Sequence, residues 1–483
     1  MSASFFFYDL ETSGFDPRFA RIMQFAGQRT DLDLNPVGEP VNCYIKMTPD
    51  VVPDPDAVLV TGITPQKTIS DGYSELEFLK IFHQEIATPG TIMAGFNNIR
   101  FDDEFIRFLN YRNFYDAYTW HWESKRDRWD ILDMIRMTRA LKPEGIEWPF
   151  ASDGRPSNRL ELLTSVNKLN HEAAHDALSD VLATIDVAKL IKSRQTQLFN
   201  HLFNNRTKTA VRNIVESKKP FMYTSGRFPS AQMHTSACIF LGRSDDNDYA
   251  LVYDLRHDPD QFMHMSAEQL IEAWKYDPET RSTKLPVKTL KYNRAPAVLP
   301  GVVKDQATLD RIQLNIDEVT ENLQKLLKHP AEFVERLFKA VKKMDQARYQ
   351  KQLDMVDNQL TVETRLYDGF IGDQDKKIMS EIQNAMPEDL AKFKGKFTDS
   401  RLNNLLPLYK AHNYPKLLIG DERQAWEEYC ASKLLGGGEE SRMAKYFKRI
   451  QELANERTSP SDQYLLEELK LYGESIIPES AAD

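Results

Sequence analysis

A hydrophobic, aromatic run near the start of the chain, from Ser4 to Tyr8, ends in two carboxylates, Asp9 and Glu11. Such a run predicts a buried strand, and because strand side chains alternate between faces, residues two apart point the same way. The two carboxylates therefore converge. Each would raise the pKa of the other unless a cation lay between them, and a hard divalent cation such as Mg²⁺ or Mn²⁺ suits oxygen ligands. The alternative is a solvated Asp-x-Glu at a junction between strand and turn.

The composition narrows the class of protein. The 483 residues, 41% hydrophobic and 11% aromatic, suffice for roughly three domains with large cores. No long uncharged apolar stretch and no basic leader is present, so neither a membrane span nor a secretory signal is predicted. Cys43, Cys238 and Cys430 lack metal-ligand spacing, which suits a reducing cytoplasm. The net charge of -10 is unusual for a nucleic-acid binder, although a local basic groove can lie on an acidic body.

The first 195 residues alternate between strand-like and helix-like patterns. The expected strands are residues 4–9, 21–29, 41–47, 91–95 and 128–130, and the expected helices are residues 74–87, 102–112, 131–141, 158–168 and 176–193. The second and third strands form a hairpin. The last helix has an apolar stripe from Ala177 to Ile191 at three- and four-residue spacing. This mixture predicts a mixed sheet flanked by helices.

The rest of the chain reads as two further domains. Residues 200–227 are basic, with Glu216 as their one acid. Strands are expected at residues 220–224, 236–242, 249–254 and 286–291, followed by helices at 306–327 and 331–345. Beyond residue 357 the pattern is mostly helical, with breaks at Pro387, Pro407, Pro415, Gly436 to Gly438 and Pro460. The predicted domains are therefore residues 1–195, 196–356 and 357–483.

A second acidic motif follows the expected strand 91–95. A loop from Asn98 delivers Phe101 and Asp102 to the start of the next helix. An aspartate at that position is a candidate metal ligand, but it is also a good N-cap residue. This segment alone leaves both interpretations open.

A third motif, between His171 and Asp180, fits two patterns. The first is His-Glu-x-x-His, in which His171 and His175 bind zinc and Glu172 is the general base. The second is His-x-x-x-x-Asp, from His175 to Asp180. Five residues turn a helix by about 500°, so His175 is better placed on a loop before the helix and Asp180 inside it. A loop histidine titrates near neutrality and can activate water.

Two features favour the second pattern. A catalytic zinc site needs a third protein ligand, and none follows at a recognisable spacing. A zinc site would also leave Asp9, Glu11 and Asp102 without a role. A further alternative, an ordinary helix with two solvated histidines, leaves the same three acids without a role. The second pattern uses all of these residues.

The three motifs, in the order Asp-x-Glu, Asn-x-x-Phe-Asp and His-x-x-x-x-Asp, resemble the DEDDh exonucleases of ribonuclease H-like fold. The resemblance matches four acidic positions and the catalytic histidine to Asp9, Glu11, Asp102, Asp180 and His175. Longer segments are similar to the bacterial exodeoxyribonuclease I family. These segments are residues 60–66, 101–104, 111–116, 128–130, 143–149 and 175–180, and more thinly 285–288 and 366–370.

The resemblance implies an α/β ribonuclease H-like exonuclease domain with a mixed sheet, followed by an SH3-like β domain and an all-α C-terminal domain. It implies a 3′→5′ exonuclease that degrades single-stranded DNA to 5′-mononucleotides in DNA repair and recombination. It also implies a cytoplasmic monomer that binds the C-terminal tail of single-stranded DNA-binding protein. The competing hypotheses are an exonuclease acting on RNA ends, a proofreading exonuclease, a zinc peptidase and a protein that binds without catalysis.

The expected cofactors are two Mg²⁺ ions about 4 Å apart, with Mn²⁺ able to substitute. Asp9 would bridge both ions. Glu11 and Asp180 would complete the shell of one, and Asp102 would help to hold the other. His175 would take the proton of the attacking water.

Binding of a single strand needs aromatic surfaces and phosphate contacts. Residues 107–136 are rich in both, although about half of these aromatic side chains should belong to the core. The predicted substrate contacts are Glu11, Arg107, Tyr118, Trp122, Arg136 and Arg159.

Overall fold

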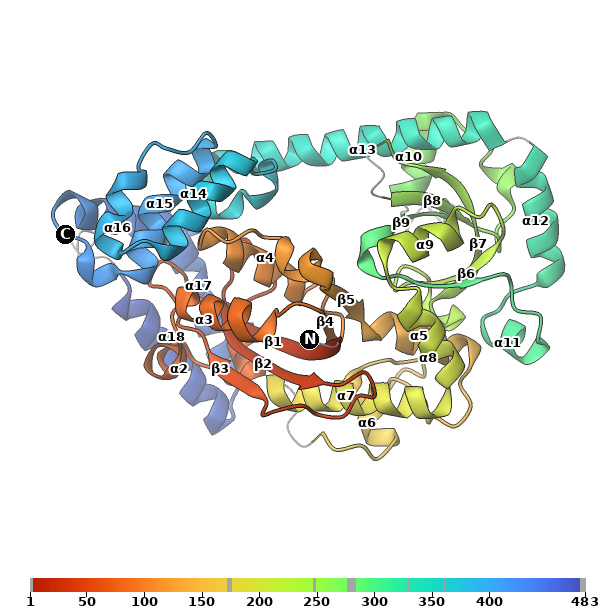
Figure 1. The fold of residues 1–483 in the computed structure, drawn as a ribbon, viewed down its shortest axis with the longest axis horizontal. Coiled ribbons are helices and arrows are strands. Elements are labelled where there is room, and N and C mark those ends of the chain that lie inside the picture. Colours follow the sequence, from red (N-terminus) through yellow and green to blue (C-terminus); the bar gives the residue numbers. More distant parts are fainter. Residues whose placement is uncertain are drawn as a thin grey trace.

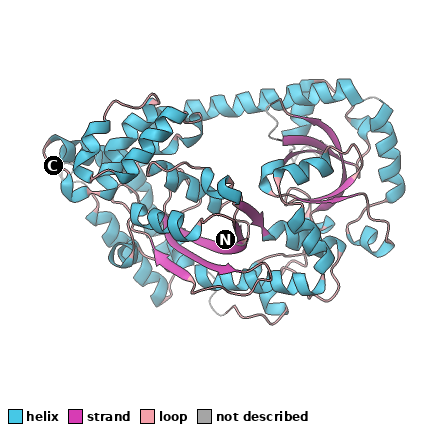
Figure 2. Cartoon of the chain, viewed as in Figure 1, coloured by secondary structure: helices cyan, strands magenta, loops and turns pink. Residues whose placement is uncertain are grey.

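The computed structural model describes residues 3–171, 176–245, 249–275, 284–328, 330–359 and 361–477. Figure 1 shows a first region built on one sheet, a second region with its own sheet, and a helical third region. The strands form two separate groups, and helices make up the rest of the framework (Figure 2). This order confirms the predicted sequence of an α/β domain, a β domain and an all-α domain.

The first sheet is mixed and has the strand order β3-β2-β1-β4-β5. β1 lies at its centre, antiparallel to β2 and parallel to β4. The aromatic run of β1 is continuous because both faces are covered: Phe5 and Phe7 enter one core, and Phe6 and Tyr8 enter the other. The expected hairpin is β2–β3. The strands are β1 (Ser4–Thr12), β2 (Ile22–Thr30), β3 (Val41–Tyr44), β4 (Thr91–Gly95) and β5 (Asp127–Asp130).

The helices of this region cover both faces of the sheet, and α7 packs directly on β1 and β2. The expected helix 74–87 is divided into α3 and a π-helical turn, Phe82–Ile86. The helices are α1 (Pro55–Thr61), α2 (Pro65–Asp71), α3 (Glu75–Ile81), α4 (Asp102–Arg112), α5 (Ile131–Leu141), α6 (Leu160–Val166), α7 (Ala177–Arg194) and α8 (Thr196–Asn204). The next helix, α9 (Lys208–Val215), packs in the core of the second sheet.

The second sheet is antiparallel, with the strand order β10-β6-β7-β8-β9. Its edge strand β10 was missed by the sequence reasoning, because it is short and ends in Pro300. The expected helix 306–327 is wrong in one respect: it is two helices, separated at Gln313, whose φ is 53°. The strands are β6 (Phe221–Thr224), β7 (Thr235–Arg243), β8 (Tyr249–Asp254), β9 (Val287–Lys291) and β10 (Ala297–Pro300). The helices are α10 (Ala267–Lys275), α11 (Gln306–Arg311) and α12 (Ile316–Lys328).

A long helix, α13 (Pro330–Gln359), runs from the second region to the third (Figure 1). Its 30 residues give it a length of about 45 Å. It extends well past the expected helix end at residue 345 and across the predicted domain boundary at residue 356.

The third region is helical, as expected. The predicted break at Pro407 is wrong, because this proline lies inside α15. Buried neighbours, including Leu405, Leu406 and Tyr409, hold the helix in the core despite the missing N–H. The helices are α14 (Asp373–Asn384), α15 (Ser400–Asn413), α16 (Asp421–Leu435), α17 (Arg442–Glu456) and α18 (Pro460–Ser475).

The third region packs against the first. Phe108, Tyr111 and Phe114 of the first region share a core with Leu366 and Tyr409 of the third. Among the described residues, no helix combines the length and the apolar character that a membrane crossing needs.

Candidate active site

Three of the predicted carboxylates meet at one end of β1. Asp9 and Glu11 lie on β1, and Asp180 lies in the first turn of α7. One oxygen from each carboxylate lies within 4.8 Å of the others. The strand alternation brings the first two together, and the packing of α7 across β1 adds the third. All three side chains are half-buried, which leaves the cluster open to a ligand.

Asp102 lies beside this cluster at the start of α4. It is buried, and its Oδ1 accepts a hydrogen bond of 3.2 Å from the backbone N–H of Leu10, between the two β1 carboxylates. The N-cap alternative is wrong, because Phe101 occupies the cap position and Asp102 is the first residue of the helix. The structure therefore brings all four predicted acids to one place.

The electrostatics of the cluster favour a cation. Burial, followed by the charges of Asp180 and Asp176, raises the pKa of Asp9 well above its ordinary value. Burial, followed by the charge of Asp9, raises the pKa of Glu11 to about 9. Burial, again followed by the charge of Asp9, raises the pKa of Asp102. An oxygen-rich set of repelling carboxylates fits a hard divalent cation such as Mg²⁺ or Mn²⁺.

These pKa shifts predict how a metal should stabilise the fold at different pH. The pKa of Glu11 is 4.5 ordinarily and about 9 in the folded chain, so the folded state holds a proton that the unfolded state has lost. Without metal, the folded state therefore loses stability as the pH rises through this window. A bound cation replaces the proton, so Mg²⁺ should raise the melting temperature more at about pH 8.5 than at about pH 6. Thermal unfolding with and without Mg²⁺ measures this, and Glu11→Gln should reduce the difference between the two pH values.

The predicted base, His175, lies outside the described residues, as does Glu172. His171 is described, and its Nε2 is hydrogen-bonded to Asp180 Oδ1 at 2.5 Å. Its Nδ1 lies 3.1 Å from Thr164 Oγ1. Sequence reasoning considered His171 as a zinc ligand or a solvated histidine and missed this contact, because a nine-residue separation matches neither helical nor strand periodicity.

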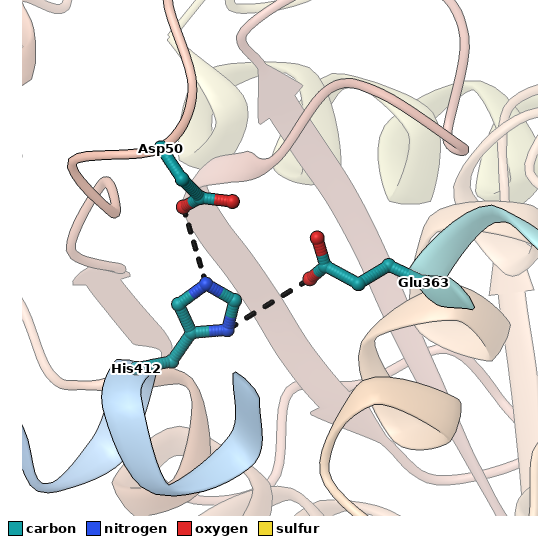
Figure 3. Close-up of side chains that lie close together, drawn as sticks. All are labelled: Asp50, Glu363 and His412. Carbon is teal, nitrogen blue, oxygen red and sulfur yellow. Dashed lines mark hydrogen bonds and ion pairs between the residues drawn. The ribbon is translucent and has the colours of Figure 1, made fainter. Parts of the chain in front are cut away.

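A second group with metal-ligand chemistry, Asp50, Glu363 and His412, lies between the first and third regions (Figure 3). His412 Nε2 lies 3.2 Å from Asp50 Oδ1. Fixed cations already occupy the group: Lys433 contacts both carboxylates, and Arg21 Nη2 lies 3.0 Å from Glu363 Oε1.

The pKa directions separate the two groups. Burial alone would raise the pKa of Asp50, but Lys433 and His412 hold it well below its ordinary value. Burial alone would also raise the pKa of Glu363, but the charges of Lys433 and Arg21 lower it. These carboxylates already have their positive partners, so the group is an ion cluster that joins two regions. Among the described residues, the β1 carboxylates Asp9 and Glu11 have no such positive partner, which suits a bound metal ion.

A groove of about 890 Å³ lies where all three regions meet. Glu104, two residues after Asp102, lines it, so it reaches the helix turn that carries Asp102. Two exposed aromatic rings border it, Trp122 at 60% exposure and Phe370 at 93%. Its cations and its other rings are Arg107, Arg128, Arg206, Lys208, Lys291, Arg294, Tyr118, His121 and Tyr367.

Three of the predicted substrate contacts, Arg107, Tyr118 and Trp122, line this groove. Arg136 and Arg159 do not line it: Arg136 bonds Asp133 at 2.8 Å, and Arg159 is largely exposed beside Glu161. The basic segment 206–227 was considered as an extension of the groove, and Arg206 and Lys208 do line it. Sequence reasoning missed Lys291, Arg294, Tyr367 and Phe370, because nothing local indicates that their segments approach α4.

Family models match the chain in three consecutive parts. The Exonuclease model matches residues 6–188, the Exonuclease I SH3-like domain matches residues 206–366, and the Exonuclease I C-terminal domain matches residues 360–476. The order agrees with the predicted exonuclease, SH3-like and helical domains.

Full-length relatives agree with these models. Exodeoxyribonuclease I of Haemophilus influenzae is 36% identical over 482 residues, covering 98% of this chain and 99% of that protein. The Escherichia coli enzyme is 35% identical over 488 residues, covering 98% of each. The E. coli Exonuclease I structure in complex with a dA16 oligonucleotide superposes with a TM-score of 0.91 at 34% identity, covering 98% of this chain and 100% of that one. Exonuclease I of Methylocaldum szegediense gives 0.89 at 37% identity, with the same coverage. The chain therefore belongs to the exodeoxyribonuclease I family, and it is a nuclease with an exonuclease domain.

Proposed function

We propose that this chain removes 5′-mononucleotides from the 3′ end of single-stranded DNA by two-metal hydrolysis, as part of DNA repair and recombination. The observation that carries the proposal is the convergence of Asp9, Glu11 and Asp180 beside a groove of cations and aromatic rings, with the pKa values of Asp9 and Glu11 raised. The E. coli relative, whose structure is in complex with a dA16 oligonucleotide, supports a single strand as the occupant of the groove.

The acidic residues would bind the metal ions, and their neighbours hold them in position. Asp9, Glu11, Asp102 and Asp180 would hold two divalent cations, which supply charge neutralisation and activation of water. Mg²⁺ is the proposed ion, and Mn²⁺ offers the same oxygen preference. Asp102 is held toward the cluster by the N–H of Leu10. His171 orients Asp180 through their 2.5 Å contact.

His175 keeps its proposed role as the base that removes the proton of the attacking water. In the sequence it comes directly before Asp176, the N-cap residue of α7. A histidine with an ordinary pKa near 6.5 can accept a proton at neutral pH.

One assay separates this proposal from its rivals. A strand labelled at either the 3′ or the 5′ end is incubated with Mg²⁺, with Zn²⁺ or with a chelator. Release of the 3′ label as a mononucleotide with Mg²⁺ supports the proposal, and retention of the label with Mg²⁺ would contradict it. A peptide substrate incubated with Zn²⁺ in parallel tests the peptidase alternative. Faster release from RNA, or from the mismatched end of a duplex, would favour the RNA-trimming or proofreading alternative.

The groove is the proposed track for the strand, with Arg107, Tyr118 and Trp122 among its contacts. Trp122→Ala should weaken binding of an oligonucleotide by about 1–3 kcal/mol, because each stacked base contributes about that much. Fluorescence anisotropy with a non-hydrolysable strand measures the change. Phe150→Ala is a matched control, because Phe150 is also 60% exposed but does not line the groove. Equal losses in both variants would contradict the assignment.

Glu104 should oppose binding, because it is an acid among the groove cations. Its Oε1 accepts a 2.7 Å hydrogen bond from Arg107 and lies 3.6 Å from Arg294, and Tyr367 donates to its other oxygen. Phosphates must compete with this carboxylate for both guanidinium groups. Glu104→Gln should therefore tighten binding about five-fold, equivalent to about 1 kcal/mol, and should steepen the salt dependence. Anisotropy titrations at several salt concentrations measure both, and weaker binding would contradict this role.

Arg136, Arg159 and Glu11 complete the proposed substrate contacts. These three residues do not line the groove. Glu11 would contact the terminal nucleotide at its phosphate, and the two arginines would contact phosphates further along the DNA strand. Arg159→Ala should weaken the binding of long oligonucleotides more than that of short ones.

The proposed biological setting follows the family. One related structure is of SSB/Exonuclease I in complex with an inhibitor, at 33% identity and a TM-score of 0.88. We extend the partner to this chain as the C-terminal tail of single-stranded DNA-binding protein, with a cytoplasmic location and a monomeric state. Anisotropy with a labelled tail peptide and light scattering after size exclusion test the partner and the monomer.

A further inference from the structure

Asp103 is the acid that follows Asp102 in α4, and both of its oxygens are bonded inside the protein. The side chain is fully buried. The hydroxyl of Tyr8 donates to Oδ1 at 2.5 Å, and Arg128 donates to Oδ2. Both oxygens of Asp103 are therefore occupied inside the protein. Its neighbour Asp102 is the acid of this pair that faces the carboxylate cluster.

The Tyr8–Asp103 bond joins the two chain segments that carry the metal-binding acids. Tyr8 immediately precedes Asp9 on β1, and Asp103 immediately follows Asp102 on α4. The 3.2 Å bond from Leu10 N–H to Asp102 forms a second link between the same segments. The two links sit on either side of Asp9 along β1, so together they fix the separation of Asp9 and Asp102.

Arg128 extends this link to the second domain. It lies on β5, and while one guanidinium nitrogen bonds Asp103, the other donates to the backbone carbonyl of Asn293 at 2.6 Å. Asn293 belongs to the short 3₁₀ helix Tyr292–Arg294 in the SH3-like domain. Arg128 therefore connects the SH3-like domain, at Asn293, with Asp103 in the first turn of α4, the turn that also carries Asp102.

We propose that Asp103 is a positioning residue for the metal centre: through Tyr8 it fixes Asp102 relative to Asp9, and through Arg128 it makes that geometry depend on the docked SH3-like domain. The inference rests on the proposed function, because it assigns metal binding to Asp9 and Asp102. Groups that orient metal ligands commonly change metal affinity or activity by about 10- to 100-fold when they are removed.

Tyr8→Phe tests the inference in the full chain, because it removes one hydroxyl and keeps the ring. The dissociation constant for Mn²⁺, measured from free Mn²⁺ by electron paramagnetic resonance, should rise about 10-fold. The rate on oligonucleotides should fall at saturating strand concentration. Tyr111→Phe is the matched control: Tyr111 is a buried tyrosine of α4 whose hydroxyl donates to Val362 O at 3.1 Å, away from the metal cluster. It should leave Mn²⁺ binding unchanged.

A second variant keeps the test decisive if Tyr8→Phe does not fold. Arg128→Lys keeps a cation beside Asp103 but cannot bond both Asp103 and Asn293, so Mn²⁺ binding should weaken here too. Unchanged Mn²⁺ affinity in every folded variant of this pair would overturn the inference while leaving the proposed function intact. Wild-type protein that binds Mn²⁺ no better than Asp9→Asn would overturn both.

Discussion

Asp9→Asn is expected to lower the maximal rate of mononucleotide release by about 10³-fold, equivalent to about 4 kcal/mol in the barrier. Asp9 lies at the centre of the carboxylate cluster, and its charge raises the pKa values of both Glu11 and Asp102. The amide keeps the shape of the side chain but removes the charge that would hold the cations. Initial rates at saturating strand and Mg²⁺ concentrations measure the loss.

The same substitution should not destabilise the metal-free fold. It removes a carboxylate that is repelled by Asp180, so the melting temperature without metal should stay constant or rise. Asp186→Asn is the control, because Asp186 lies on the same helix as Asp180 but pairs with Lys189 instead. Near wild-type rates are expected for the control. A fully active Asp9→Asn enzyme would refute the metal assignment.

Lys433→Met is expected to lower the free energy of unfolding by about 3–5 kcal/mol, the usual cost of removing one partner from a buried ion pair. Lys433 contacts Asp50 of the first domain and Glu363 of the C-terminal domain, and all three side chains are almost completely buried. Its loss leaves two carboxylates short of positive charge in a low-dielectric interface. Urea unfolding, followed by circular dichroism, measures the change.

The matched control for Lys433→Met is Arg449→Met. Arg449 bonds Asp56 across the same pair of domains, but the two side chains are 36% and 45% exposed. Water screens such pairs, so the expected loss is about 0–1 kcal/mol. Similar losses in the two variants would contradict the idea that the buried cluster joins the domains.

The strand and helices that carry the acids could be predicted because their signals are local. The aromatic run before Asp9 predicts a buried strand, and the apolar stripe of α7 places Asp180 at a helix start. The motif order then indicates that separate segments meet. Side-chain alternation gives the relation of Asp9 to Glu11 directly, without any tertiary information.

The contacts between domains could not be predicted in this way. Asp50 lies 383 residues before Lys433 in the chain and Glu363 lies 70 residues before it, and each alone looks like a solvated surface charge. The groove combines α4 with Arg294 and Tyr367 from the other two domains, and no periodicity reports such an approach. Arg136, a predicted substrate contact, also bonds Asp133 of its own helix, a pairing that the charge pattern alone did not indicate.

The attachment of the C-terminal domain has a consequence for the continuity of the polypeptide. That domain follows α13 in the chain, yet its buried ion cluster and shared apolar cores bind it to the N-terminal domain. A backbone nick within α13 would therefore yield two fragments that stay associated as a split protein. The polypeptide reaches the C-terminal domain through α13, whereas the non-covalent contacts join that domain directly to the N-terminal domain. The two fragments should therefore reassemble when they are supplied as separate polypeptides.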